Sequence, residues 1–214
     1  MKDMSFKNII FDLDGTIIDS MPVWENTTME FMERQKVELP KDFDDNIKTM
    51  SLKKGTEYIS QILGGKMTAE EVMEVYIDMV QDKYEHHIPL KEGAYEFLNK
   101  MYENGVRMSI LTASEMKYIL PALERLDVKK FFENIYTCSM LELGKDSPEV
   151  YVKAADVFGY DIKDTFVFED ALHAALSAKA AGFKVCGVYD EAEEETAELK
   201  EAADIYIKSY IELM

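Results

Sequence analysis

Short apolar runs recur along the chain with helical patterns between them, and this alternation limits the fold more than any other feature. The runs are rich in Ile, Val, Phe and Tyr. Strands that alternate with helices form a parallel sheet covered by helices, so we expect an α/β fold of that kind. The expected strands are Asn8–Asp12, Arg107–Thr112, Ile135–Cys138, Thr165–Glu169, Lys184–Tyr189 and Asp204–Ile207.

The alternation stops between Ser20 and about His87, where helical patterns occur without a convincing strand. Thr68 and Glu71 form a capping box, which predicts the start of one helix. The apolar spacing from Val23 to Val37 and from Leu52 to Leu63 predicts two more. We therefore predict an all-helical domain at residues 20–87, inserted into a core formed by residues 1–19 and 88–214.

The charge of the chain excludes several classes of partner. It has 24 basic and 42 acidic residues, a formal net charge of −18. Such acidity argues against binding to nucleic acid or to an anionic membrane surface, because both need a basic surface. The Asp190–Asp204 segment is especially acidic, and we interpret it as a solvated helix near the C-terminus.

The cysteines and the N-terminal sequence bear on the cellular location. Cys138 and Cys186 are too few for a disulfide framework or a four-thiolate zinc site, and we expect both to pack on core strands. No basic-then-apolar leader is visible, and no apolar run approaches the roughly 18 residues that span a bilayer. We expect a soluble cytoplasmic protein, and nothing in the sequence indicates a protein partner.

The sequence Phe11-Asp12-Leu13-Asp14-Gly15-Thr16 places two carboxylates directly after an apolar strand. An EF-hand calcium loop needs glycine at its sixth position, whereas here the glycine is fourth counted from Asp12, so that interpretation fails. A simple Asp-Gly turn would explain such a pair in isolation. It does not explain the polar groups that follow other expected strands.

Three further segments place polar groups at the same edge of the expected sheet. Thr112 and Ser114 follow one strand, Lys145 lies in a loop before a helix opened by Ser147-Pro148, and Glu169-Asp170 ends another strand. Ligands of open α/β sheets bind at this edge. Carboxylates gathered there would repel one another without a hard cation, and their oxygens suit Mg²⁺. A hydroxyl and a lysine beside the cation would hold a phosphate.

In order and spacing, these segments resemble the motifs of the haloacid dehalogenase-like superfamily, which includes aspartate-nucleophile phosphatases and phosphomutases. The motif Asp-x-Asp-Gly-Thr is fully present, and the helical insert lies where this family has its class I cap. The resemblance implies a Rossmann-like core in which Asp12 is the nucleophile and Asp14 the general acid and base. It implies that Thr112 and Lys145 neutralise the phosphoryl oxygens. The implied Mg²⁺ ligands are Asp12, the main-chain carbonyl of Asp14, Asp170 and, directly or through water, Glu169.

The resemblance also narrows the reaction. Dehalogenases of the superfamily lack the second aspartate and phosphonatases replace it, so Asp14 points to phosphate esters. The segment that begins at Asp19 resembles that of hexose phosphate phosphatases, whereas related sugar phosphomutases carry histidine where this chain has Trp24. We therefore predict a Mg²⁺-dependent phosphatase acting on a small phosphorylated metabolite, in particular a sugar phosphate. The alternatives are a phosphomutase of the β-phosphoglucomutase type and a catalytically weak regulator that binds a phosphorylated ligand.

Three residues are candidate substrate contacts, each with a structural alternative. Ser114 either donates to the phosphate or caps the helix that follows it. Trp24 either lines the entrance to the site or packs inside the insert. Lys48 belongs to residues 46–56, which contain lysines and no acids. It either meets an anionic substrate or lies on an exposed helix start.

Two positions depart from the family pattern. The fourth motif often continues Asp-Ser, where this chain has Asp170-Ala171, so the resemblance implies the loss of a secondary hydroxyl hydrogen bond. The third motif commonly continues Lys-Pro, where this chain has Lys145-Asp146. Neither change removes a principal chemical group.

Overall fold

The computed structural model describes residues 6–48, 50 and 52–214. The chain divides into two compact units, one made of the residues up to Met21 together with Ile88–Met214, the other of Pro22–His87. The first unit contains the strands and the second contains helices only, within the described ranges.

The first unit is built on a six-stranded sheet, counted over the described residues, with the order β3-β2-β1-β4-β5-β6. Every paired neighbour in this sheet runs parallel. The chain builds outward from β1 in one direction and then from β4 in the other, so the topological switch point lies between these two strands. The predicted α/β fold is confirmed. The strands are β1 (Asn8–Phe11), β2 (Arg107–Thr112), β3 (Asn134–Thr137), β4 (Thr165–Glu169), β5 (Lys184–Val188) and β6 (Ile205–Ile207).

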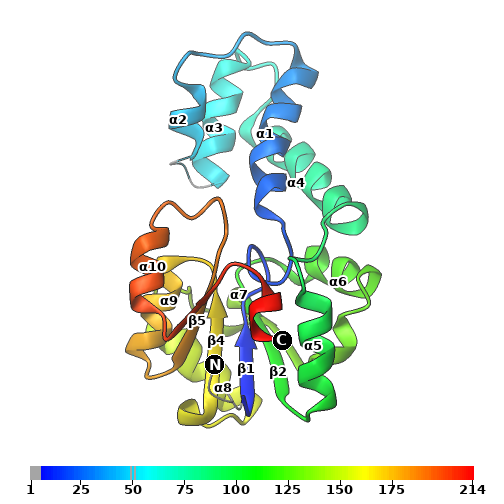
Figure 1. The fold of residues 1–214 in the computed structure, drawn as a ribbon. Helices are drawn as coiled ribbons and strands as arrows, with labels where there is room; N and C mark the ends of the chain where they lie inside the picture. The colour runs from blue at the N-terminus through cyan, green and yellow to red at the C-terminus, as the bar shows by residue number, and fades with distance from the viewer. Residues whose placement is uncertain (1–5, 49, 51) are drawn as a thin grey trace. The chain divides into compact units, whose positions relative to one another are not determined.

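Helices cover both faces of the sheet. Successive strand residues point to opposite sides, so each strand packs against both layers of helices. Ile10 and Val167 pack on one side in an apolar cluster with residues of α7 to α10. Phe11 and Phe168 pack on the other, where the ring of Tyr210 stacks on Phe168. Figure 1 shows α5 and α6 on this second side. The bounds are α5 (Ala94–Glu103), α6 (Met116–Arg125), α7 (Cys138–Leu141), α8 (Pro148–Phe158), α9 (Leu172–Ala180) and α10 (Thr196–Ala202), with short 3₁₀ helices η1 (Lys129–Phe131), η2 (Ile162–Asp164) and η3 (Tyr210–Leu213).

The second unit consists of helices around an apolar core of its own, which includes Phe31, Phe43 and Val72. The predicted capping box is confirmed at the start of α4. The Glu71 N–H donates to the Thr68 hydroxyl at 3.2 Å, and the Thr68 N–H donates to the Glu71 carboxylate at 2.8 Å. The helices are α1 (Met21–Gln35), α2 (Phe43–Lys48), α3 (Leu52–Ile62) and α4 (Ala69–His86).

Cys138 does not end a core strand, contrary to the sequence-based expectation. It is the first residue of α7, because Thr137 ends β3 and caps this short helix. The Thr137 hydroxyl accepts a hydrogen bond from the Met140 N–H at 3.3 Å, which turns the chain out of the strand. Cys138 is nevertheless buried, as expected for a small apolar side chain.

The Asp190–Asp204 segment is not one solvated helix, and in this respect the sequence interpretation is wrong. Only Thr196–Ala202 is helical. Asp190 is 2% exposed and accepts a hydrogen bond from the Lys91 ammonium at 2.7 Å. A buried carboxylate needs such a partner, and the pair fixes the loop after β5 to the segment that re-enters the first unit.

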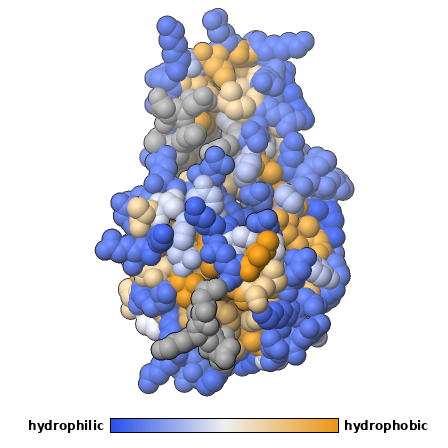
Figure 2. All heavy atoms as spheres, viewed as in Figure 1, coloured by the Kyte–Doolittle hydropathy of each residue, from blue (hydrophilic) through white to orange (hydrophobic). Residues whose placement is uncertain are grey.

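Hydrophilic side chains predominate on the face drawn in Figure 2, in keeping with a chain in which 31% of the residues are charged. Among the helices in the described ranges, none combines the length and the apolar character needed to cross a membrane.

Candidate active site

The loop after β1 carries the first motif and folds back on itself. The Ile17 and Ile18 N–H groups both donate to the Leu13 carbonyl, at 2.9 and 3.0 Å. Gly15 makes this turn possible because its φ of +78° lies in the left-handed region. A Cβ atom at Gly15 would also lie 2.2 Å from Asp170 Oδ2, so only glycine lets the two segments approach this closely.

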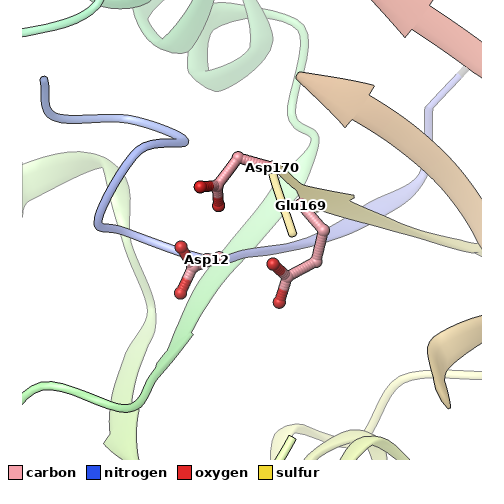
Figure 3. A group of neighbouring side chains, drawn as sticks. All are labelled: Asp12, Glu169 and Asp170. Carbon is pink, nitrogen blue, oxygen red and sulfur yellow. The ribbon is translucent and has the colours of Figure 1, made fainter. Parts of the chain in front are cut away.

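Asp12, Glu169 and Asp170 bring three carboxylates together. Asp12 directly follows β1, and Glu169 and Asp170 lie at the end of the neighbouring β4. One carboxylate oxygen from each lies within 4.8 Å of the others, and Figure 3 shows the three groups converging. The residues are 6%, 1% and 8% exposed, respectively. The structure therefore places the three carboxylates at one edge of the sheet, where the sequence predicted them.

Lys145 supplies a positive charge to this group of carboxylates. Its ammonium donates to Asp12 Oδ1 and, at 2.6 Å, to Glu169 Oε1. Burial alone would lower the pKa of Lys145, but the neighbouring Asp12 and Glu169 carboxylates raise it above its ordinary value. Lys145 is therefore a permanent cation in contact with Asp12.

One ammonium does not balance three buried carboxylates. Burial raises the pKa of Asp12 to about 7, in spite of the Lys145 ammonium beside it. Burial, and then the Asp12 and Glu169 carboxylates, raise the pKa of Asp170 well above its usual range. Both shifts disfavour the ionised form of a carboxyl group, first through burial and then through the neighbouring negative charges. A set of buried oxygen donors with surplus negative charge fits a hard divalent cation such as Mg²⁺.

Asp14 is not one of the three gathered carboxylates, and hydroxyl groups donate to its side chain. The Ser20 hydroxyl donates to Asp14 Oδ1 at 2.7 Å, and the Ser114 hydroxyl donates to Asp14 Oδ2 at 2.6 Å. The two serines come from the segment after the first motif and from the loop after β2. The Asp14 side chain is therefore oriented by two separate segments, outside the group of three carboxylates.

Ser114 and Thr112 together line the Asp14 side of the site. Ser114 does not cap α6, because the N-cap position is Glu115 and no side chain bonds there. Thr112 Oγ1 accepts from the Ser114 N–H at 3.0 Å and lies 3.5 Å from Asp14 Oδ2, the outer limit of a hydrogen bond. Of the two alternatives for Ser114, the capping role is wrong.

The fold and this geometry agree with a comparison against known families. The sequence profile of the haloacid dehalogenase-like hydrolases matches residues 9–188. The chain belongs to this family. The match includes each of the motif segments described above.

Other members of the family provide more specific comparisons. Hexitol phosphatase B of Escherichia coli is 26% identical over 175 residues, which cover 80% of this chain and 78% of that protein. A crystal structure from Thermotoga maritima, assigned as a β-phosphoglucomutase, has a TM-score of 0.84 at 22% identity and covers 95% of this chain and 94% of that one. The structure of the Bacillus subtilis hydrolase YfnB bound to magnesium has a TM-score of 0.78 at 16% identity, covering 98% and 97%. These two structures show the fold alone. The family match and the phosphatases among the relatives support a phosphoric monoester hydrolase.

This haloacid dehalogenase-like hydrolase compensates for one of its departures from the family pattern. Ala171, at the N-cap of α9, offers no side-chain hydrogen bond to the helix. The Glu193 carboxylate, from the loop after β5, accepts from the Leu172 N–H at 2.9 Å instead. A residue of the acidic segment therefore caps the helix that directly follows Asp170 and Ala171.

Sequence reasoning gave no role to three residues that contact the site of this hydrolase. The Thr16 hydroxyl donates to Asp170 Oδ1 at 3.0 Å, and the Tyr151 hydroxyl donates to Glu169 Oε1 at 2.8 Å. Ser20 was expected in the helical insert but lies in the first unit. Thr16 is part of the first motif, and this position could have indicated that it contacts the site. Nothing in the local sequence around Tyr151 marks it.

The remaining two candidates cannot be compared with the structure. Trp24 belongs to α1 and Lys48 is the last residue of α2. Their side chains lie outside the described part of the chain. Their roles in binding a substrate remain predictions.

Proposed function

We propose that this protein is a Mg²⁺-dependent phosphatase that hydrolyses a small phosphorylated metabolite, in particular a sugar phosphate. The observation that carries the proposal is the contact of Lys145 with both Asp12 and Glu169, beside Asp170. This arrangement places a carboxylate nucleophile against a permanent cation. A phosphoryl group bound there would have its negative charge neutralised as Asp12 approaches phosphorus.

The first chemical step forms a covalent intermediate. An Asp12 carboxylate oxygen forms a bond to phosphorus, and the bond between phosphorus and the ester oxygen breaks. The proton of the Asp14 carboxylic acid passes to the departing alkoxide, which leaves as an alcohol. Lys145 and Thr112 would donate to the non-bridging phosphoryl oxygens during this transfer, while the Ser114 hydroxyl keeps its hydrogen bond to Asp14.

The second step regenerates the enzyme. Asp14, now a carboxylate, takes a proton from a water molecule while the water oxygen forms a bond to phosphorus. The bond between phosphorus and the Asp12 oxygen breaks, which releases inorganic phosphate and the free carboxylate. Asp14 is protonated again at the end of the cycle, so one carboxyl group serves both steps.

The residues that would hold Mg²⁺ are Asp12, the main-chain carbonyl of Asp14, and Asp170, with Glu169 contributing directly or through water. Bound there, the ion would neutralise charge on the phosphoryl oxygens. The raised pKa values of Asp12 and Asp170, and the approach of their oxygens to those of Glu169, support this assignment. The magnesium in YfnB is consistent with it.

The choice of substrate class depends on a relative and on the helical insert. Hexitol phosphatase B is named for a sugar alcohol phosphate, and the segment that begins at Asp19 resembles that of hexose phosphate phosphatases. We propose that the helical unit acts as a cap that selects the leaving group. In that role Trp24 and Lys48 are the candidate contacts.

Phosphate release from p-nitrophenyl phosphate, measured with Mg²⁺ and with chelator, tests the proposal. We expect turnover with Mg²⁺ and none above background with the chelator. A panel of hexose phosphates, hexitol phosphates, phosphoglycolate and nucleotides would then identify the leaving group. The absence of phosphate release from every compound would overturn the proposal and favour a regulator that only binds its ligand.

The same panel separates hydrolysis from isomerisation. A phosphomutase would convert a hexose 1-phosphate to its 6-phosphate with little free phosphate, and phosphorus NMR of the products detects both outcomes. The Thermotoga structure assigned as a β-phosphoglucomutase makes this comparison worthwhile. We expect inorganic phosphate as the main product.

A further inference from the structure

Tyr151 places a hydroxyl group in the interior of the first unit, against the candidate active site. The residue lies in the first turn of α8 and is 1% exposed. Its ring belongs to the apolar cluster beneath the sheet, together with Val150 and Ala154. Its hydroxyl donates to Glu169 Oε1 at 2.8 Å. A phenol this deeply buried needs a partner, and here that partner is one of the three gathered carboxylates.

The same Glu169 oxygen also receives the Lys145 ammonium, at 2.6 Å. Oε1 is therefore shared by two donors from α8 and from the loop before it, which restricts rotation of the carboxylate. The Glu169 carboxylate also offers an oxygen to the group formed with Asp12 and Asp170. Because Lys145 contacts Asp12 as well, the phenol is linked to the nucleophile through two groups, the Glu169 carboxylate and the Lys145 ammonium.

The phenol remains a donor under working conditions. Burial, and then the negative charge of Glu169, raise the pKa of Tyr151 well above its ordinary value. The hydroxyl therefore keeps its proton and can only donate to the carboxylate. A neutral donor orients Glu169 without adding a charge to the site.

We propose that Tyr151 is a positioning residue, whose hydroxyl fixes Glu169 and thereby aligns Lys145 with Asp12 and the carboxylates with a bound divalent cation. The inference rests on the proposed phosphatase function. A positioning role differs from a packing role, in which the ring fills space and the hydroxyl only needs some hydrogen-bond partner. Loss of a group that orients a metal-binding carboxylate commonly lowers metal affinity or activity by roughly 10–100-fold.

The chain offers a matched control in Tyr160. This tyrosine belongs to the same apolar cluster and is 6% exposed. Its hydroxyl is 2.7 Å from the Ser109 hydroxyl and contacts none of the three carboxylates. Tyr151→Phe and Tyr160→Phe therefore each remove one buried, hydrogen-bonded hydroxyl from one cluster, but only the first touches the site.

The experiment measures Mg²⁺ affinity by isothermal titration calorimetry without substrate, together with kcat and KM for p-nitrophenyl phosphate. For Tyr151→Phe we expect the Mg²⁺ dissociation constant to rise and kcat to fall, each on the order of 10-fold, with KM changed much less. For Tyr160→Phe we expect the Mg²⁺ dissociation constant and kcat to stay within about 2-fold of the wild-type values. Thermal unfolding of both variants checks that each is folded.

A double-mutant cycle with Glu169→Gln tests whether the hydroxyl acts through Glu169. We expect Tyr151→Phe to have little further effect on Mg²⁺ affinity in the Glu169→Gln background, because the oriented group has already been changed. Fully additive effects would overturn the inference. So would equal Mg²⁺ affinity and kcat in Tyr151→Phe and Tyr160→Phe.

These outcomes remain distinct from failure of the proposed function. If the wild type neither binds Mg²⁺ nor releases phosphate, the proposed function and the inference fall together. If the wild type does both and the two tyrosine variants behave alike, only the positioning role of Tyr151 is overturned.

Discussion

Asp12 and Asp14 lie in one loop, yet their surroundings are opposite. Asp12 is buried among charges, in contact with Lys145 and close to Glu169 and Asp170. Asp14 is partly exposed and is held by the hydroxyls of two serines. Ion pairs thus hold the Asp12 carboxylate, whereas hydroxyl donors contact the Asp14 carboxylate.

The difference shows how one residue type can serve two roles in one site. Two carboxyl groups in different environments divide the chemistry between them. Asp12, fixed against a permanent cation, is suited to attack phosphorus and to bind a metal ion. Asp14, held by the hydroxyls of Ser20 and Ser114, is suited to carry a proton to and from the reacting oxygen. Substitutions in the Asp12 region and in the Asp14 region should therefore have different effects on catalysis and on metal binding.

The largest effect is expected for Asp12→Asn, which removes the proposed nucleophile. An amide does not attack phosphorus, so kcat for p-nitrophenyl phosphate should fall on the order of 10⁴-fold or more. Asp164→Asn is the control, since Asp164 precedes β4 at the opposite edge of the sheet and pairs with Lys7 on the surface. Near-normal turnover in Asp12→Asn would contradict the assignment.

Asp14→Asn should separate chemistry from metal binding. We expect kcat to fall roughly 10²–10⁴-fold, because the proton carrier is lost. Mg²⁺ affinity should change little, since the side chain contacts serines and its expected metal ligand is the main-chain carbonyl. With p-nitrophenyl phosphate, whose leaving group needs no proton, the phosphorylated enzyme should accumulate, and intact-protein mass spectrometry would detect it. A large loss of Mg²⁺ affinity would show that the two regions are not separate.

The strands and the charged part of the site could be predicted because both follow from local patterns. The apolar runs that end in Asp12 and Glu169 are strands buried on both faces, and parallel pairing brings their ends together. The contacts of Ser20 and Tyr151 could not be predicted in this way. They depend on side-chain directions in a loop and in a helix, which are fixed only when these elements pack.

Strand ends were the least predictable local feature, as Cys138 illustrates. Its apolar character continues the pattern of β3, but the Thr137 hydroxyl caps a new helix one residue earlier. A side chain that bonds to the backbone competes with the strand and ends it. Similarly, the acidic composition around Asp190 suggested solvent exposure, whereas Lys91, distant in sequence, makes burial possible.

Ser114→Ala should produce a smaller effect, confined to the Asp14 region. The variant loses one hydrogen bond to a carboxylate, which corresponds to roughly a 10-fold fall in kcat. The fall should be larger for an alkyl phosphate, whose leaving group needs the Asp14 proton, than for p-nitrophenyl phosphate. Ser139→Ala is the control, because the Ser139 hydroxyl donates to Glu115 and does not contact Asp14. Equal effects on the two substrates would show that Ser114 does not act through Asp14.

Glu193→Ala should have the smallest effect, and it probes how the charged region is supported from a distance. Glu193 caps α9, which begins two residues after Asp170, so its loss should lower the free energy of unfolding by about 1 kcal/mol. Urea unfolding would measure the change. Glu193→Gln keeps an acceptor oxygen and should lose less of the free energy of unfolding. Adding Ala171→Ser to Glu193→Ala should recover part of this loss, because it places a hydroxyl at the N-cap. If Glu193→Ala is as stable as the wild type, the cap contributes nothing. In the Asp14 region, by contrast, Ser20 and Ser114 contact the carboxylate directly.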